Sequence, residues 1–412
     1  MDHRPYDITI YGASGFTGQY VAAEAVRTCK EKKIAIAGRK KDKLEKVLEF
    51  IRKEIGTDDA LNNVGIVIAD NSNNDSVMEM CRQSRIVINC VGPFRWYGEQ
   101  VVRCCVEASS NYVDISGEPE FLQTCQIKYH EEAKEKGIHI VGACGFDSVP
   151  ADFGLEVLRD KFPGELTAAE SYIHLYGAGK GNYGTYLTII HSIVTRANVK
   201  AQQKVIFKEK LSYTGPRLKL RNPGFSNSEN KWFVPFLGAD ASVVKRTQLH
   251  ESSVHNKTPV QYAAYMTMGS ILHLVCGFLF ALVMFVLTKC AWGIKLLEDY
   301  PKLFSFGVFS KDGVTPEELA KSGFKMVFHG KGYSKKPESS TSAGRPDRSM
   351  SMKFCGPEVG YIFTSISLVA AASTILDDSL RNSGGVLTPG SALRETQFLE
   401  RLTKRGVKIE II

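Results

Sequence analysis

The chain has 412 residues, of which 43% are hydrophobic, and its 52 basic and 44 acidic residues give a formal net charge of +8. This length predicts two or three domains at roughly 100–200 residues each, and the hydrophobic content excludes a largely disordered chain. The charge is mild and no dense basic block alternates with aromatic residues. We therefore expect no nucleic acid partner, whereas an anionic lipid or an anionic cofactor suits the basic surface.

The cysteines and the N-terminus indicate a cellular compartment. Ten cysteines are scattered along the chain and none forms a C-x-x-C pair, so no redox or zinc motif of that kind is predicted. Reduced and mostly buried thiols are typical of the cytosol. The opening stretch "MDHRPYDITIYG" contains no signal-peptide apolar region, and we expect a protein that is not secreted.

Short β-branched runs alternate with segments of helical spacing over the first 145 residues. Strands are expected at 6–11, 33–37, 64–69, 85–91, 111–115 and 138–142, and helices at 17–30, 41–55, 74–83, 98–109 and 119–136. This alternation predicts an α/β domain over 1–150, built on a doubly wound parallel sheet of the Rossmann type.

A glycine-rich turn follows the first expected strand with the spacing G-x-x-G-x-x-G. Here the chain turns sharply, approaches a pyrophosphate without a Cβ in the way, and packs the next helix against the sheet. The N–H groups at that helix start favour phosphate, and the Ser14 and Thr17 hydroxyls add donors. We predict a dinucleotide site, and a structural turn without ligand is the alternative. The residues of this site are Gly12, Ser14, Gly15, Phe16, Thr17 and Gly18.

Basic residues end the second strand, where an NAD-binding domain would place an acid. Arg39 and Lys40 follow Gly38, and the first acidic residue is Asp42. A guanidinium matches a ribose 2′-phosphate in charge and in fork geometry. We therefore predict NADP(H) as the cofactor, with Arg39 and Lys40 in its site, and a solvated helix start is the alternative.

Two later loops complete the predicted cofactor site. Asp70 closes the third strand in "VGIVIAD", and there it either accepts from the adenine amino group or caps the next helix. The fourth strand ends in "INCVGPF", which we expect over the carboxyl edge of the sheet near the nicotinamide. From this second loop we predict contacts by Asn89, Val91, Gly92 and Pro93.

Few titratable or hydroxyl groups follow the later strands. They are Arg95, Tyr97 and Glu99 after the fourth, Asp114, Ser116 and Glu118 after the fifth, and Asp147 and Ser148 after the sixth. Hydride transfer needs little from a protein beyond orientation and a proton donor or acceptor. Tyr97 is a candidate donor if Arg95 acidifies its phenol, and Asp114 or Asp147 is a candidate base or substrate-positioning group.

For each of these residues taken alone, we expect a structural role ahead of a catalytic one. Asp114 and Glu118 are expected to cap the helix that begins near Pro119, and Asp147 and Ser148 to cap the next helix. No cluster of His, Asp and Glu shows metal-ligand spacing in the sequence. We therefore predict no metal site.

After about residue 150 the pattern changes to longer strands and helices. We predict an α+β substrate or dimerisation domain over 151–360, with a mobile loop at 334–350 in "SKKPESSTSAGRPDRSM". The tail at 361–412 is expected to hold helices and a strand that pack back on the first domain. For the oligomeric state, a homodimer is one of the alternatives that we retain.

An uncharged run, "ILHLVCGFLFALVMFVL", occupies 271–287 within a hydrophobic segment at 269–288. It is apolar on all sides of a helix and at the short limit for spanning a bilayer, and a buried core helix is the alternative. Lys289, Lys295 and the aromatics of "AWGIKLLEDYPKLFSFGVFS" are typical of a membrane interface. Because spanning would divide one domain, we expect insertion into one leaflet, on the cytosolic face of a membrane or a lipid-droplet monolayer.

Six motifs occur in order along the chain: "YGASGFTG", "AGRKKDKL", "VINCVGPF", "YVDISGE", "GFDSVPADFG" and, near the end, "TPGSAL". Together they resemble the saccharopine dehydrogenase-like oxidoreductases, the animal members above all, and the family also resembles bacterial trans-acting enoyl reductases. The resemblance implies a nucleotide-binding domain, a second α+β domain, an oxidoreductase class and association with membranes or lipid droplets. It does not imply saccharopine as the substrate.

Three hypotheses follow for function. The leading one is a membrane-attached NADP(H)-dependent oxidoreductase with a small-molecule substrate that is lipid-like or apolar. The second is a non-catalytic NADP(H) sensor or scaffold at a lipid surface, which the lack of an obvious proton donor favours. The third is a soluble amino-acid dehydrogenase whose apolar run belongs to the core.

Overall fold

The computed structural model describes residues 4–57, 59–146, 148–177, 181–208, 211–310, 314–335 and 344–412. The chain divides into two units, and each is described by itself. Unit 1 comprises Met1–Phe146 and Gly360–Arg405, and unit 2 comprises Asp147–Val359 and Gly406–Ile412.

Unit 1 is built on a seven-stranded sheet with the strand order β15-β6-β5-β4-β1-β2-β3. Every neighbouring pair in this sheet is parallel. The strands are β1 (Tyr6–Tyr11), β2 (Ile34–Gly38), β3 (Val64–Ile68), β4 (Ser84–Asn89), β5 (Asn111–Asp114), β6 (His139–Val141) and β15 (Gly385–Leu387). The expected doubly wound parallel sheet is thus confirmed, and the late strand β15 extends it by one strand that the sequence pattern did not indicate.

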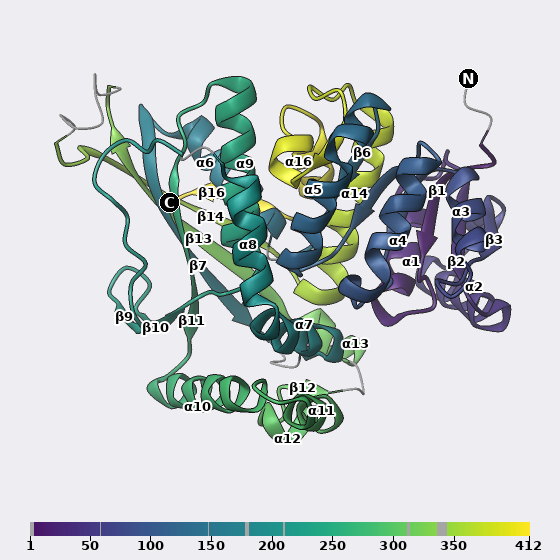
Figure 1. Ribbon diagram of the computed structural model, residues 1–412, viewed down its shortest axis with the longest axis horizontal. Coiled ribbons are helices and arrows are strands. Elements are labelled where there is room, and N and C mark those ends of the chain that lie inside the picture. Colours follow the sequence, from purple (N-terminus) through teal and green to yellow (C-terminus); the bar gives the residue numbers. More distant parts are fainter. Residues whose placement is uncertain are drawn as a thin grey trace. The chain divides into compact units, whose positions relative to one another are not determined.

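The helices of unit 1 cover both faces of this sheet (Figure 1). They are α1 (Phe16–Thr28), α2 (Lys41–Ile55), η1 (Asp59–Leu61), α3 (Asn74–Arg82), α4 (Phe94–Glu107), α5 (Pro119–Glu135), η2 (Val359–Phe363), α14 (Thr364–Asp377), α15 (Pro389–Ala392) and α16 (Phe398–Lys404). The chain winds outward from β1 in one direction and from β4 in the other. Right-handed crossovers then place α1 and α2 on one face and α4 and α5 on the opposite face.

Apolar runs fill the sheet of unit 1 because both of its faces are covered. Ile8, Ile36, Ile86 and Ile88 are fully buried, which is why these strands read as continuous apolar stretches without polar alternation. The described stretch Val359–Asp377 is the one helix long and apolar enough to cross a membrane, and 78% of its apolar window is buried. Since α14 packs against α1, β4 and β5, this stretch is a core helix of unit 1.

Unit 2 contains a second, mixed sheet of seven strands in the order β16-β14-β13-β7-β11-β10-β9. Only β7 and β11 pair in parallel, and the remaining pairs are antiparallel. The strands are β7 (Glu165–Tyr176), β9 (Gly224–Ser226), β10 (Lys231–Pro235), β11 (Gln261–Met268), β13 (Gly323–Tyr333), β14 (Arg348–Pro357) and β16 (Lys408–Ile411), with a small pair β8 (Gly181–Asn182) and β12 (Phe309–Ser310) outside it. The last strand, β16, thus belongs to unit 2, whereas we expected the whole tail to pack on the first domain.

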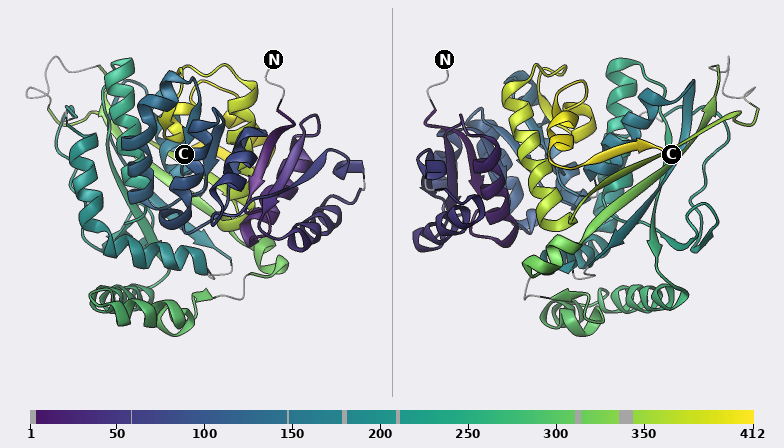
Figure 2. Two further views of the ribbon diagram at one scale, coloured as in Figure 1. Left: turned by 45° about the vertical axis from the view of Figure 1, so that its right-hand side comes forward. Right: turned by 180° about the vertical axis from the view of Figure 1, so that it is seen from behind.

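Two groups can be distinguished among the helices of unit 2. They are α6 (Ser148–Lys161), α7 (Tyr183–Val194), α8 (Arg196–Ile206), α9 (Asp240–His255), α10 (Ile271–Leu287), α11 (Ala291–Asp299), α12 (Pro301–Phe304) and α13 (Pro316–Lys321). The helices α6 and α9 pack together against the sheet. The helices α10, α11 and α12 gather beyond one end of its strands, as Figures 1 and 2 show. The mobile loop predicted at 334–350 connects β13 to β14, and its central residues 336–343 lie outside the described part of the chain.

Candidate functional site

The glycine turn between β1 and α1 leaves an open backbone surface at the helix start. Gly12 has a φ of +85°, and a Cβ there would lie 2.7 Å from Cγ2 of Val91. A Cβ on Gly18 would lie 2.2 Å from the carbonyl oxygen of Gly12. Both positions therefore need glycine, the first for its conformation and the second for close packing of α1.

The top of this turn is accessible. Ser14, Gly15 and Phe16 are exposed, while Thr17 is half-buried. Gly15 is the N-cap of α1, and its lack of a side chain leaves the first turn without a side-chain cap. Uncapped N–H groups and the partial positive charge of a helix start suit a phosphate group, so these residues fit the predicted cofactor.

Arg39 and Lys40 lie at the carboxyl end of β2 and both are exposed. Asp70 follows β3, the neighbouring strand, and accepts a hydrogen bond from the N–H of Ser72 at 3.0 Å. That bond holds the pKa of Asp70 below its usual value, and the positive charge of Arg39 acts in the same direction. Asp70 therefore lies near Arg39 as an ionised group.

Asp70 does not cap the helix that follows it. The N-cap of α3 is Asn73, whose side chain accepts from the N–H groups of Asp75 and Ser76. Asp70 instead shapes the turn before the helix, where its own N–H donates to the Ser76 hydroxyl at 3.0 Å. The capping alternative is thus wrong, and contact with adenine stays a prediction.

The loop after β4 meets the glycine turn, since Val91 lies directly beneath Gly12. Asn89 is fully buried, its Oδ1 accepts from the N–H of Val91 at 2.9 Å, and its Nδ2 donates to the Tyr112 hydroxyl at 3.1 Å. Gly92 is exposed above it, and the Gly92–Pro93 peptide bond is cis. Asn89 thus acts by shaping the loop, and Gly92 offers the open backbone.

Asp114 ends β5 at the same edge of the sheet and is 1% exposed. Its Oδ1 accepts from the N–H of Ser116 at 2.9 Å and of Ala143 at 2.8 Å. Burial raises the pKa of Asp114 to about 6, although these two N–H groups and the Tyr112 hydroxyl oppose the shift. The carboxyl group therefore titrates closer to neutrality than an exposed aspartate does, and it holds the loops after β5 and β6 together.

Glu118 and Arg95 form a pair that the sequence did not indicate. Nε of Arg95 donates to Oε2 of Glu118 at 2.7 Å, and their side chains are 10% and 2% exposed. The same carboxylate accepts from the N–H groups of Phe94 and Arg95 at the start of α4. Glu118 thus caps α4 and does not cap α5, which begins beside it without a side-chain cap from its N-cap residue.

The pair of Arg95 and Glu118 bears on the predicted role of Tyr97 as a proton donor. Arg95 pairs with Glu118, and its expected action on the Tyr97 phenol stays a prediction. The Tyr97 side chain is 41% exposed, and its carbonyl oxygen accepts from Nδ2 of Asn71 at 3.1 Å. Tyr97 stays a candidate proton donor by position alone, and the other candidate, Asp147, lies outside the described residues.

A second candidate surface lies on α10 of unit 2. One side packs Phe280, Val283, Met284 and Leu287 into a cluster with Tyr186, Ile190 and Leu297. The opposite side forms the apolar helix face, which we define as Ile271, Leu272, Val275, Phe278, Leu279, Leu282, Phe285 and Val286, each between 45% and 69% exposed. The alternative of a buried core helix is therefore wrong.

The strand order, the open glycine turn and the exposed guanidinium after β2 define unit 1 as a dinucleotide-binding domain that suits NADP(H). A family model described as the saccharopine dehydrogenase NADP binding domain matches residues 8–141. A saccharopine dehydrogenase-like oxidoreductase of Homo sapiens is 38% identical over 100% of this chain and 98% of its own length. The chain belongs to the saccharopine dehydrogenase-like oxidoreductases, and unit 1 binds NADP(H).

Two further comparisons bear on this family. The lipid droplet localized protein of Caenorhabditis elegans is 35% identical, with 98% of each chain covered. The solved apo saccharopine dehydrogenase (L-Glu forming) of Saccharomyces cerevisiae aligns over 99% of this chain and 100% of its own, with a TM-score of 0.52 and 11% identity. At that identity the yeast structure supports the fold alone.

Proposed function

We propose that this protein is an NADP(H)-dependent oxidoreductase that works at the surface of a lipid droplet or membrane and acts on a lipid-like or apolar substrate. The observation that carries the proposal is the apolar helix face. Soluble proteins rarely expose a contiguous apolar patch of this size unless it binds a partner or a membrane. The name of the C. elegans relative supports a lipid droplet as that surface.

The geometry of α10 favours insertion into one leaflet over a span. Its 17 residues correspond to about 26 Å of helix, less than the roughly 30 Å of a bilayer core. Its other side is bound to α7 and α11, so it cannot be surrounded by lipid without losing that packing. A helix that keeps one side on the protein and lays the other into lipid satisfies both constraints.

The neighbouring residues suit the boundary between lipid and water. Trp292, Leu303 and Phe306 extend the apolar surface beyond α10 and are 62% to 69% exposed. Nζ of Lys289 lies 4.4 Å from the centre of the Phe285 ring. A lysine beside an inserted aromatic ring keeps its ammonium at the headgroups while its stem lies along apolar surface.

In unit 1 the residues have distinct tasks. The turn at Gly12–Gly18 would hold the pyrophosphate of the cofactor, and Arg39 would pair with the 2′-phosphate. When bound, the nicotinamide supplies or accepts a hydride. We propose Asp114 as a positioning residue that fixes the loops after β5 and β6, and we keep Tyr97 as the candidate proton-transfer group of unit 1. Asp147, the first residue of unit 2, stays a candidate from the sequence alone.

Flotation of the protein with artificial lipid droplets tests the surface attachment. The double substitution F278E and F285E places two charges on the apolar helix face without touching its packed side. We expect the bound fraction to fall by more than about tenfold, whereas V205E, at an exposed residue of α8, should float like the unaltered protein. If the double variant floated as well as V205E, attachment through α10 would be refuted.

A second experiment separates the enzyme from the sensor or scaffold hypothesis. The purified protein is incubated with NADPH and fractionated lipid or polar extracts, and the loss of reduced nicotinamide absorbance is followed. Oxidation that depends on an apolar fraction supports the proposal. Tight NADPH binding without oxidation in any fraction supports the non-catalytic alternative, and oxidation by polar fractions only refutes a lipid-like substrate.

A further inference from the structure

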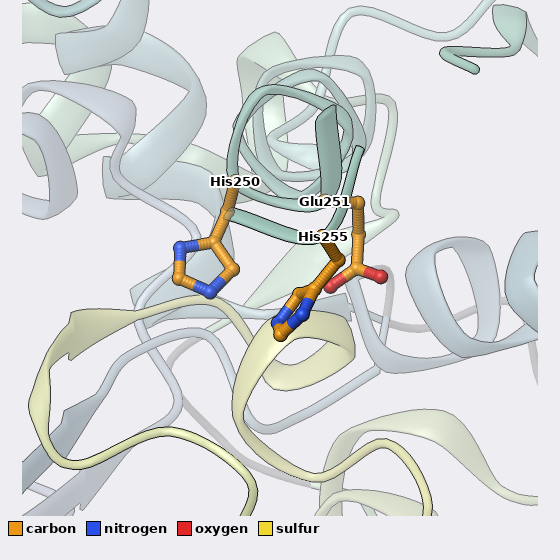
Figure 3. A group of neighbouring side chains, drawn as sticks. All are labelled: His250, Glu251 and His255. Carbon is orange, nitrogen blue, oxygen red and sulfur yellow. The ribbon is translucent and has the colours of Figure 1, made fainter. Parts of the chain in front are cut away.

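The C-terminal end of α9 brings together three side chains that the mechanism above does not use. His250, Glu251 and His255 each offer a ligand atom, and these three atoms lie within 4.8 Å of one another. Figure 3 shows the three side chains projecting on the same side of the helix end. This group was not identified from the sequence because its spacing matches no common metal motif.

The end of the helix explains the convergence. Glu251 and His255 are four residues apart and share one side of α9, and His250 precedes Glu251 by one residue. The helix then ends at Asn256 in the left-handed conformation, with a φ of +52°. The N–H of Lys257 donates to the carbonyl oxygen of Glu251 at 3.0 Å, which turns the chain back and holds His255 beside the last turn.

The donors suit a borderline-soft divalent cation. Two imidazoles and one carboxylate are a common ligand set for Zn²⁺. The Glu251 side chain is fully buried, and a buried carboxylate needs compensating positive charge. The end of a helix adds partial negative charge that favours a cation.

A second observation points to a ligand at the same place. Nε2 of His255 is buried and has no hydrogen-bond partner within the part of the chain that the structure describes. A buried ring nitrogen without a partner costs on the order of 1–3 kcal/mol. Coordination of a cation through this nitrogen would remove that cost. The rings of His250 and His255 lie 5.8 Å apart at 67°, so both imidazoles are close to one another at the end of the helix.

We propose that His250, Glu251 and His255 bind one zinc-type divalent cation at the end of α9, with water in the remaining coordination positions. The site lies within unit 2, so this proposal is independent of the cofactor and of lipid attachment. Because all three ligands belong to the C-terminal end of α9, an ion there would stabilise the last turns of that helix.

Lys257 competes with a bound cation for the carboxylate of Glu251. Its Nζ lies 3.3 Å from Oε2 of Glu251, and its side chain is 29% exposed. Monodentate coordination would use one carboxylate oxygen and leave the other to the lysine. The ammonium still repels a cation, so its removal should tighten binding while removal of either imidazole should weaken it.

The test is a titration of the full chain, stripped with a chelator, with Zn²⁺ against a chromophoric competitor. We expect one equivalent to bind. H250A and H255A should each weaken binding by more than about tenfold, since a lost ligand costs at least as much as a lost outer-shell partner. K257A should tighten binding. The control H273A alters an exposed histidine whose ring pairs with Ser270 and should bind like the unaltered chain.

Co²⁺ gives a readout that does not depend on the stability of any variant. The unaltered protein should show visible absorption bands of a low-coordinate Co²⁺ site at one equivalent, and Zn²⁺ should abolish them. The proposal is overturned by the absence of saturable binding, by H250A and H255A that bind like H273A, or by K257A that binds more weakly than the unaltered chain.

Discussion

Arg39 and Asp114 are charged side chains at the same edge of the unit 1 sheet, and their surroundings are opposite. Arg39 is exposed after β2, so its guanidinium is available to an anion. Asp114 is 1% exposed and its pKa is raised to about 6 because burial disfavours the charged form. The first side chain is therefore the one we propose for recognition of the cofactor, and the second couples the fold to pH.

Replacing Arg39 should separate the two coenzymes. R39A should weaken NADPH binding by about 2 kcal/mol, the scale of a lost charge-assisted contact, while NADH binding hardly changes because NADH has no 2′-phosphate. Calorimetric titration with both coenzymes measures this difference. K43A, at an exposed lysine of α2, is the matched control, and equal losses for both coenzymes in R39A would contradict the assignment.

Replacing Asp114 should change how stability depends on pH. The folded-state pKa of about 6 lies above the unfolded value of 3.8, so the folded protein binds more protons between these values and becomes less stable as pH rises through them. The loss amounts to about 3 kcal/mol above pH 6. D114N keeps an acceptor for Ser116 and Ala143 and should lack this dependence. Urea unfolding at pH 5 and pH 8 checks it, and parallel pH profiles for the two proteins would contradict it.

Whole elements depend on partners that are distant in the sequence. The start of α4 is held by the carboxylate of Glu118, which reaches back from the loop before α5. The π-type turn η2 and α14 come from the far end of the chain and complete the core of unit 1. Such contacts connect segments that no local pattern relates.

Removing Glu118 should therefore cost far more than removing an exposed acid. E118A leaves the nearly buried guanidinium of Arg95 without its partner and exposes two N–H groups of α4, a loss of about 3 kcal/mol. E107A breaks an exposed pair with Arg103, whose side chains are 40% and 46% exposed, and should cost less than about 1 kcal/mol. Chemical unfolding of both variants measures the contrast, and similar losses would show that Glu118 has no special role.

At the scale of the whole molecule, each unit combines two separate segments of the chain. Unit 1 takes Gly360–Arg405 and unit 2 takes Gly406–Ile412. The segment in unit 1 contains α14, in which 12 of 14 residues are buried. The family model spans only residues 8–141, so the cofactor-binding unit is larger than the matched region.

A truncated chain tests this arrangement. Residues 1–146 alone should fail to unfold cooperatively and should bind a hydrophobic dye, because the apolar surfaces of α1, β4 and β5 that α14 covers become exposed. The same residues joined by a short linker to 360–405 should fold and bind NADPH. Circular dichroism during heating distinguishes the two, and cooperative unfolding of the shorter chain would contradict the prediction.

Local pattern was sufficient for the sheet and the glycine turn of unit 1. The helix expected at 41–55 is α2 (Lys41–Ile55), and the strand expected at 6–11 is β1 (Tyr6–Tyr11). Strands that are buried on both faces appear as continuous apolar runs, and glycines that close packing requires recur at a fixed spacing. Both can therefore be recognised from the local sequence. Local pattern could not identify Glu118 as the cap of α4, since that bond joins residues 24 and 23 positions apart.

The order of apolar runs, the glycine spacing and the basic residue after the second strand were enough to determine the fold of unit 1 and its coenzyme, because each depends on short-range sterics or on charge. Only the tertiary structure decided which residues are exposed or brought together. In the folded chain one side of α10 is exposed, Val359–Asp377 is mostly buried, and His250, Glu251 and His255 lie close together. Burial and long-range contact depend on where distant segments pack, and a linear pattern carries no such information.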